Sequence, residues 1–384
     1  MAISAGAGVS TLYYAQPLLP RLAEGFGVGT GSISLSITAT QVGYVIGLLL
    51  LLPLGDRFPR RRLVPLVSLA SSLFLGLSAL ASNFWHFLLA ALFIGITAVS
   101  GQLLVPFAAD LAREQDRGRV IAKVMSGILA GILLARLASG TIAALLSWRW
   151  VYLIAALLMS ASAVLLYRVL PAEEPQSAAL HKRSLLTPWQ LLRAHRLLRH
   201  RALLGALCFG IFTSTWTSLS FLLAASPYHY GPALIGLFSL AGLAGVAAAN
   251  LAGHHADQGR AFRSALIAAL GISLACFMLL LASTQLLVLV VAIVILDMGV
   301  QAMAISNQAI YYRLDAKARS SINAAYMASS FIGGAIASVL SGQALAAHGF
   351  TGGMFIASCL ALCASALALL NFGRPSQSSD LSVI

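Results

Sequence analysis

Long apolar segments, separated by short polar stretches, dominate the hydrophobic pattern of this 384-residue chain. Several run roughly 18 residues or more with little or no charge, which is long enough to cross a bilayer as a helix. The pattern predicts twelve spans, near residues 2–22, 35–54, 63–82, 84–106, 119–144, 149–170, 200–225, 232–253, 262–283, 285–308, 320–346 and 350–371. It indicates an all-α membrane protein and excludes a soluble domain.

Basic residues lie in every second loop of this pattern. The chain has 24 Lys and Arg residues, and all but Arg21, Arg136 and Arg149 fall in short clusters at the ends of spans. The clusters are Arg57 with Arg60 to Arg62, Arg113 to Lys123, Arg168 to Arg201, Arg260 with Arg263, Arg313 to Arg319, and Arg374. Cationic loops are retained on the cytoplasmic side, so we expect an inner-membrane protein with both chain ends in the cytoplasm.

Composition narrows the possible partners. Hydrophobic residues make up 59% of the chain and the mean hydropathy is +0.90. The net charge of +13 would suit nucleic acid, but these cations lie at span ends, where anionic lipid head groups are the expected partner. We therefore expect membrane lipid, and no nucleic acid.

Other functional classes lack their signatures. The three lysines are not in the glycine-rich context of a phosphate-binding loop, and a membrane enzyme would need paired carboxylates or a histidine cluster. We expect no enzyme, no cofactor and no metal site. All four cysteines fall in predicted spans, so we expect no disulfide framework, and we interpret Cys359 and Cys363 as packing residues.

A polar stretch divides the chain. We predict a six-helix bundle over 1–170, a cytoplasmic linker over 171–199, a second six-helix bundle over 200–372 and a disordered tail over 373–384. Within the linker, Thr187 and Pro188 are typical of a helix start. The residues that follow have leucines opposite arginines, as in an amphipathic helix on the inner leaflet. Met1 leads almost directly into the first span, so we expect no removable secretion peptide.

The two halves repeat each other at an offset near 201 residues. Gly55-Asp56-Arg57 precedes the first basic turn, and Gly253 with Asp257 precedes the matching turn of the second half. Internal repeats of this kind are typical of secondary transporters.

These residues resemble the major facilitator superfamily along essentially the whole chain. Asp56, Arg57, Arg60 and Arg61 match the signature of its loop between the second and third helices, although Leu52 and Pro59 replace two glycines. The run Tyr13-Tyr14-Ala15-Gln16-Pro17 and the set Gly131, Ser139 and Gly140 resemble the drug/proton antiporter branch, where Ala135-Arg136 replaces the usual Gly-Pro.

The resemblance implies two pseudo-symmetric six-helix bundles and a monomer that moves a small-molecule substrate by alternating access. The antiporter branch further implies proton-coupled efflux. An importer of the same fold, a channel and a non-transporting membrane sensor remain alternatives.

Charges at the loop signature suggest gating. Asp56 would dock on the start of the helix near Ser320, and Asp257 on the start of the helix near 119, because unsatisfied amides there carry partial positive charge. Arg57, Arg60 and Arg61 belong to the same signature. The alternative is that the arginine cluster merely fixes topology.

Two charges lie inside predicted spans, Arg136 and Asp297. A charge at mid-bilayer is costly and is rarely kept without a use. Counting 1.5 Å per residue from the outer span ends places both roughly 15 to 18 Å deep. We predict that Asp297 is the proton-coupling group and that Arg136 meets it across the halves, with substrate contact as the other use that either charge can have. The alternative is a static buried ion pair.

Polar and aromatic residues at similar depth are predicted to form the substrate cavity. They are Tyr13, Tyr14, Gln16, Gln102, Trp216, Gln301, Asn307, Asn323 and Tyr326. The alternative is that each bonds a neighbouring helix. The pairs Gly43/Gly47, Gly127/Gly131 and Ala241/Gly245 have the small-residue spacing that predicts close helix packing.

Overall fold

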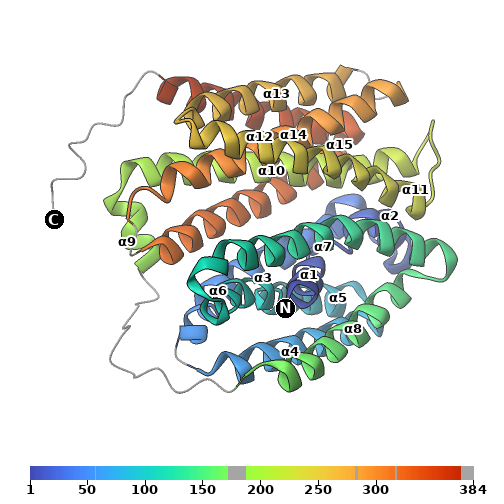
Figure 1. Cartoon of the computed structure of the whole chain (residues 1–384). Coiled ribbons are helices and arrows are strands. Elements are labelled where there is room, and N and C mark those ends of the chain that lie inside the picture. The colour runs from blue at the N-terminus through green and yellow to red at the C-terminus, as the bar shows by residue number, and fades with distance from the viewer. Residues whose placement is uncertain (57, 172–186, 282–283, 316–317, 373–384) are drawn as a thin grey trace. The chain divides into compact units, whose positions relative to one another are not determined.

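The computed structural model describes residues 1–56, 58–171, 187–281, 284–315 and 318–372, and these ranges contain helices and no strands (Figure 1). The α-helices are α1 Ala2–Ser10, α2 Leu19–Phe26, α3 Thr30–Leu50, α4 Arg60–Ala79, α5 Phe84–Thr97, α6 Ser100–Leu111, α7 Arg117–Leu145, α8 Trp148–Val169, α9 Thr187–Ala194, α10 Arg196–Ala224, α11 Pro232–Leu237, α12 Gly242–Asp257, α13 Ala261–Leu281, α14 Leu286–Tyr311 and α15 Arg319–Phe372. Short 3-10 turns lie at Gln16–Leu18, Pro53–Asp56, Glu114–Asp116 and Phe238–Ala241.

Ten helical stretches of the described ranges are long and apolar enough to cross a membrane. One of them, Ser321–Leu370, contains a turn at Gly349, whose φ of 63° lies in the left-handed region. Glycine adopts this conformation without the clash that a Cβ would cause. The stretch therefore holds two of the predicted spans, and the all-helical membrane class is confirmed.

The first predicted span is wrong as a continuous helix. α1 ends at Ser10, and α2 begins at Leu19 after a turn and the 3-10 segment Gln16–Leu18. Pro17 and Pro20 explain the break, because proline has no amide hydrogen for the helical ladder and its ring clashes with the preceding turn. The span predicted over 84–106 is likewise divided, into α5 and α6.

The chain forms two compact units, which are described separately. Unit 1 consists of Met1–Leu185 with Leu219–Ser239, and unit 2 consists of Leu186–Ser218 with Leu240–Ile384. The boundaries at 170 and 200 stay predictions. Most of the predicted linker, and the predicted tail, lie outside the described residues.

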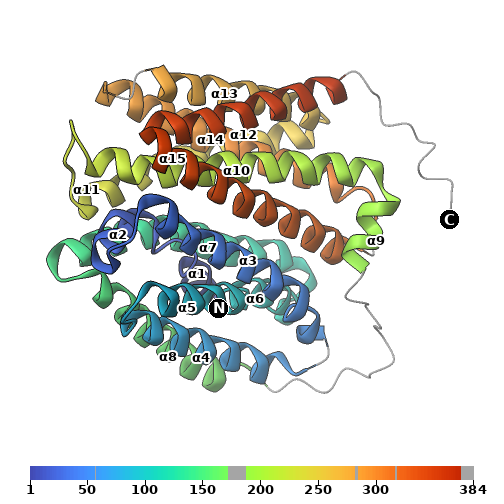
Figure 2. The ribbon, with the colours of Figure 1, turned by 180° about the vertical axis from the view of Figure 1, so that it is seen from behind.

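In unit 1, α4 packs along α8, α3 along α5, and α1 along α7 (Figure 2). Glycines permit the close approaches. A Cβ at Gly43 would overlap the carbonyl oxygen of Leu92, one at Gly47 that of Ile96, and one at Gly131 that of Gly6. The close packing predicted at these glycines is confirmed.

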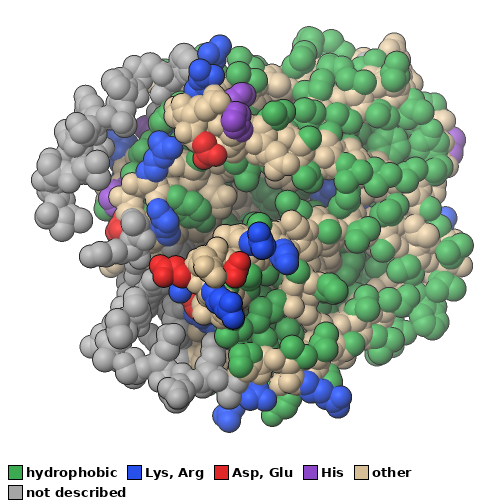
Figure 3. Space-filling view, in the orientation of Figure 1, with side chains coloured by type: hydrophobic (Ala, Val, Ile, Leu, Met, Phe, Trp, Pro, Cys, Tyr) green, Lys and Arg blue, Asp and Glu red, His purple; other side chains and the backbone are tan. Residues whose placement is uncertain are grey.

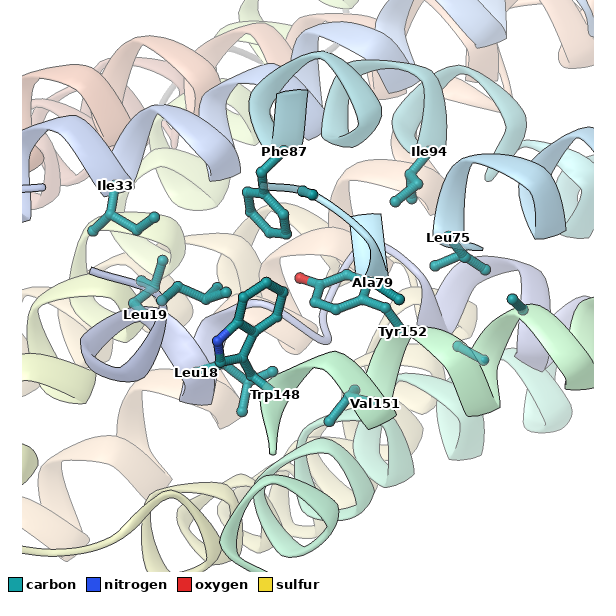
Figure 4. Packing of buried hydrophobic residues seen from close by; sticks show 14 of the residues in the cluster. Leu18, Leu19, Ile33, Leu75, Ala79, Phe87, Ile94, Trp148, Val151 and Tyr152 are labelled. Carbon is teal, nitrogen blue, oxygen red and sulfur yellow. The ribbon is translucent and has the colours of Figure 1, made fainter. Parts of the chain in front are cut away.

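An aromatic cluster forms the core at one end of unit 1 (Figure 4). Phe87 meets Trp148 and Tyr152 edge to face, with ring centroids 5.9 and 5.5 Å apart. Leu18 and Leu19 lie beside the Trp148 ring, so the residues after the break in the first span are anchored here.

In unit 2, α14 packs against both α12 and α13, and α15 packs against α13 and α9. Leu191 and Leu192 of α9 contact a buried cluster around Tyr311 and Ile322. Protein contacts therefore cover part of the apolar side of the amphipathic helix expected on the inner leaflet.

Large apolar side chains remain exposed on the outer faces of these helices (Figure 3). Leu73, Leu157 and Phe277 are examples. Cys359 and Cys363 are also exposed, so they are not packing residues inside the bundle, whereas Cys208 and Cys276 are buried. A lipid environment would cover such a surface.

Candidate functional site

Arg136 is buried in unit 1, on α7, with 3% of its surface exposed. Its Nε donates a hydrogen bond to Oε1 of Gln16 at 2.6 Å. Its guanidinium lies over the ring of Tyr13, 5.1 Å from the centroid. A cation on an aromatic face is attracted by the ring quadrupole, and this attraction strengthens away from water. Arg136 thus joins two residues of the predicted cavity.

The broken start of the chain positions Gln16. The backbone carbonyl of Gln16 accepts a hydrogen bond from the Ser220 hydroxyl at 2.8 Å, within unit 1. α11 packs against α7 beside Arg136, where a Cβ at Gly236 would crowd the Arg136 carbonyl and one at Gly140 would overlap the Pro232 carbonyl. Small residues on both helices therefore bring the backbones of α7 and α11 close together at Arg136.

Tyr44 extends this polar group and was missed by sequence reasoning. It is 1% exposed, on α3, and its hydroxyl is hydrogen-bonded to the side chain of Gln102. A lone tyrosine in an apolar helix gives no signal of its own, because it is more often packed in a core. Tyr14 is partly exposed and hydrogen-bonds Ser10.

Asp297 is buried in unit 2, in the interior of α14, with 4% of its surface exposed. The indole N–H of Trp216 donates to its Oδ1 at 3.4 Å. Gly245 of α12 faces this segment, since a Cβ there would meet Gln301 Cγ at 2.9 Å and the Asp297 carbonyl oxygen at 3.2 Å. Three of the residues singled out from sequence, Asp297, Trp216 and Gln301, therefore lie in one region of unit 2.

A second polar group of unit 2 lies farther along α14. The Asn307 amide accepts from Arg201 Nη1 at 3.4 Å and donates to the Tyr326 hydroxyl at 3.3 Å. Tyr311 donates to Asn323 at 2.8 Å. Asn307 is ten residues from Asp297, which is roughly 15 Å along a helix axis. The predicted cavity residues of unit 2 therefore belong to two layers.

Arg201 is buried, although its position predicts a place in the basic cluster at a span end. Its side chain is 1% exposed and is the largest fully buried one in the described chain. Its guanidinium lies 4.3 Å from the centroid of Phe262. Position near a span end did not reveal this burial, because the side chain direction depends on the packing of α10.

The gating signature is described in part. Arg57 and the side chain of Asp56 lie outside the described residues. Arg60 forms a 2.6 Å ion pair with Asp110 and donates from Nε to the Gly55 carbonyl at 3.1 Å. Sequence reasoning missed Asp110, because it is 50 residues away in the chain.

The remaining signature residues lie at helix ends. The guanidinium of Arg61 lies 5.8 Å from the centroid of Tyr167. Asp257 is exposed at the last residue of α12. Docking of Asp56 and Asp257 on helix starts stays a prediction, as does a meeting of Arg136 with Asp297.

A model of the Major Facilitator Superfamily matches residues 1–314, which is well over half of the chain. The chain belongs to the Major Facilitator Superfamily. Members of this superfamily are transporters and not enzymes, so the protein is a multi-pass membrane transporter of the secondary active class. The family resemblance read from the loop signature is confirmed.

Bacterial relatives of this superfamily member are similar over most of the chain. The "Uncharacterized transporter YgaY" of Escherichia coli O157:H7 is 39% identical over 362 residues, which cover 94% of this chain and 92% of that protein. The "Inner membrane transport protein YnfM" of Escherichia coli K12 is 28% identical over 255 residues, covering 64% of this chain and 60% of that protein.

Among solved structures, a bacterial homolog of the human lysosomal transporter Spinster, in an inward-facing and occupied conformation, aligns with a TM-score of 0.75. The alignment covers 96% of this chain and 94% of that one at 13% identity. At this identity the similarity shows the superfamily fold alone.

Proposed function

We propose that this transporter exports a small solute in exchange for protons, and that Asp297 is the coupling group. The observation that carries the proposal is the place of Asp297, which is the only buried acid among the side chains that the structure describes. An ionised carboxylate away from water is energetically costly, so such a residue is rare unless it has a function. Proton uptake neutralises it, and access from alternate sides of the membrane would tie that uptake to conformation.

Arg136 is proposed as the partner charge in unit 1. It is held by Gln16 and Tyr13, so its guanidinium is positioned and keeps its charge. In an alternating cycle, Arg136 would stabilise the ionised form of Asp297 in the state where they approach and favour protonation in the state where they separate. The competing interpretation, a static ion pair between the halves, predicts no response of transport to proton concentration.

The substrate path is proposed to run along the two polar regions. Tyr13, Tyr14, Gln16 and Gln102 would line it in unit 1, and Trp216, Gln301, Asn307, Asn323 and Tyr326 in unit 2. Aromatic walls with few fixed charges suit amphipathic or moderately polar solutes. The signature residues Asp56, Arg57, Arg60, Arg61 and Asp257 would bias the closed state of the inner side.

Location and direction belong to the same proposal. The basic loops favour an inner membrane with both chain ends cytoplasmic, and a relative carries the words "inner membrane transport protein". Import by proton symport, or uniport, is the alternative. The Tyr13 to Pro17 run of the antiporter branch favours export.

The test begins with a solute screen by thermal shift on the purified full chain, since a ligand of the folded state raises its melting temperature with occupancy. The stabilising solute is then loaded into proteoliposomes under an imposed pH gradient. We expect gradient-driven flux in the wild type. Asp297→Asn should abolish that flux while leaving the solute-induced melting shift in place.

Glu24→Gln is the matched control, because Glu24 is an exposed carboxylate whose contact is with Arg21, three residues away. This variant should transport like the wild type. Unchanged gradient-driven flux in Asp297→Asn would exclude Asp297 as the coupling group.

A further inference from the structure

Arg201 is a second buried cation, and few of its N–H donors have a hydrogen-bond acceptor among the described residues. A guanidinium has five N–H donors in a fixed planar fork. One hydrogen bond, from Nη1 to Asn307, is long at 3.4 Å, and the buried Nε has no acceptor among the described residues. Unsatisfied buried donors are rare in native proteins and call for an explanation, such as an ion or a ligand that completes the site.

The charges of the described interior do not balance. Among the Lys, Arg, Asp and Glu side chains of the described residues, the buried ones are the two cations Arg136 and Arg201 and the single acid Asp297. Asp297 cannot neutralise Arg201, because the residue that Arg201 contacts on α14 is roughly 15 Å farther along that helix. An uncompensated buried charge is strongly unfavourable, so an anion from outside the described chain would stabilise this layer.

The surroundings of Arg201 suit a carboxylate. Phe262 covers one face of the guanidinium and leaves the edge of the fork as the binding direction. The Tyr326 hydroxyl accepts from Asn307 and also hydrogen-bonds the Ser330 side chain, so it belongs to the polar wall beside Arg201. The planar guanidinium fork itself matches a carboxylate, which accepts two parallel bonds from an arginine.

We propose that the transported solute carries a carboxylate and that Arg201 binds it. The proposal deepens the proposed function and depends on transport, but not on proton coupling through Asp297. Arg201 lies five residues from the start of α10, at the end of that helix expected to face the cytoplasm. A solute anion leaving the cell would meet this charge early in its path, and the positive potential would raise its local concentration.

The experiment compares carboxylates with their neutral amides on the full chain in detergent micelles. Melting temperatures are recorded with the sodium salts of acetate, benzoate and succinate, with acetamide, benzamide and succinamide, and with sodium chloride for ionic strength. Tetraphenylphosphonium and phosphatidylglycerol serve as cationic and lipid probes. We expect at least one carboxylate to raise the melting temperature and its amide to have no effect.

Variants locate the site. Arg201→Gln should weaken carboxylate binding about tenfold or more, as expected for loss of charge-assisted hydrogen bonds. Arg201→Lys should bind with intermediate affinity, because a single ammonium keeps the charge and loses the fork. Arg263→Gln is the control, since Arg263 is an exposed arginine in the first turn of α13.

Several results would overturn the inference. They are equal effects of acids and amides across the panel, a carboxylate response that survives Arg201→Gln, and stabilisation by tetraphenylphosphonium or phosphatidylglycerol without any by free carboxylates. If Arg201→Gln does not fold, the wild-type panel and Arg201→Lys decide the matter. Carboxylate binding without gradient-driven flux would instead contradict the proton coupling and leave Arg201 as an anion site.

Discussion

At the scale of single residues, the two charges inside spans, Arg136 and Asp297, are both buried and both lie against aromatic side chains. Arg136 and Asp297 were found because a charge inside an apolar span is conspicuous. Their contacts, Gln16 and Tyr13 for Arg136 and Trp216 for Asp297, depend on side-chain directions that one sequence does not encode locally. The burial of Arg201 could not be predicted for the same reason.

The Arg136 contact gives a stability prediction at this scale. Gln16→Ala removes the acceptor of a 2.6 Å hydrogen bond from a buried guanidinium. We expect the free energy of unfolding to fall by about 1–3 kcal/mol, the usual cost of leaving a buried polar donor unsatisfied. The measurement is unfolding of the purified chain in mixed detergent micelles.

Gln115→Ala is the control for that change. Gln115 is exposed in the 3-10 turn Glu114–Asp116, so its truncation should leave the unfolding free energy within experimental scatter. Equal stability of Gln16→Ala and the wild type would mean that the Gln16 contact does not stabilise the buried cation.

At the scale of elements, hydropathy located nearly every helix, but not the breaks within them. Spans predicted from apolar length agree with α4, α8 and α13 to within a few residues. The break after α1 arises from Pro17 and Pro20, which were visible but were included in one apolar run. The division between α5 and α6 falls at Ala98, where no proline or glycine stands at the break itself to predict it.

Close helix packing supplies a prediction for an element pair. Gly43 places α3 against the backbone of α5, and a Cβ there would overlap the Leu92 carbonyl oxygen. Gly43→Ala should therefore lower the free energy of unfolding by about 1–3 kcal/mol through overpacking, as measured by thermal or detergent-induced unfolding.

Gly76→Ala provides the matched comparison within α4. No heavy atom lies within 4 Å of a Cβ built at Gly76. Alanine is favoured over glycine in a helix interior by up to about 1 kcal/mol, so this variant should be as stable as the wild type or slightly more stable. The packing argument fails if the two substitutions have the same effect.

At the scale of the whole molecule, alternation of basic and apolar segments was enough to predict the all-helical membrane class, and the loop signature was enough to predict the superfamily. The repeated Asp before a basic turn, at Asp56 and Asp257, carried the family resemblance. Substrate chemistry could not be predicted in this way, because it depends on the few groups that converge in space. Asn307 hydrogen-bonds both Arg201 and Tyr326, and the spacing of these residues in the sequence does not predict that they meet.

The central claim is that Asp297 exchanges its proton for the solute, and the pH dependence of solute affinity tests it most directly. If proton and solute compete, the dissociation constant of a stabilising solute should rise by up to about tenfold per unit as pH falls through the titration of one group. Asp297→Asn should show a nearly constant affinity over the same range. A dissociation constant that decreases as the pH is lowered would indicate symport. A pH dependence that persists in Asp297→Asn would contradict the account.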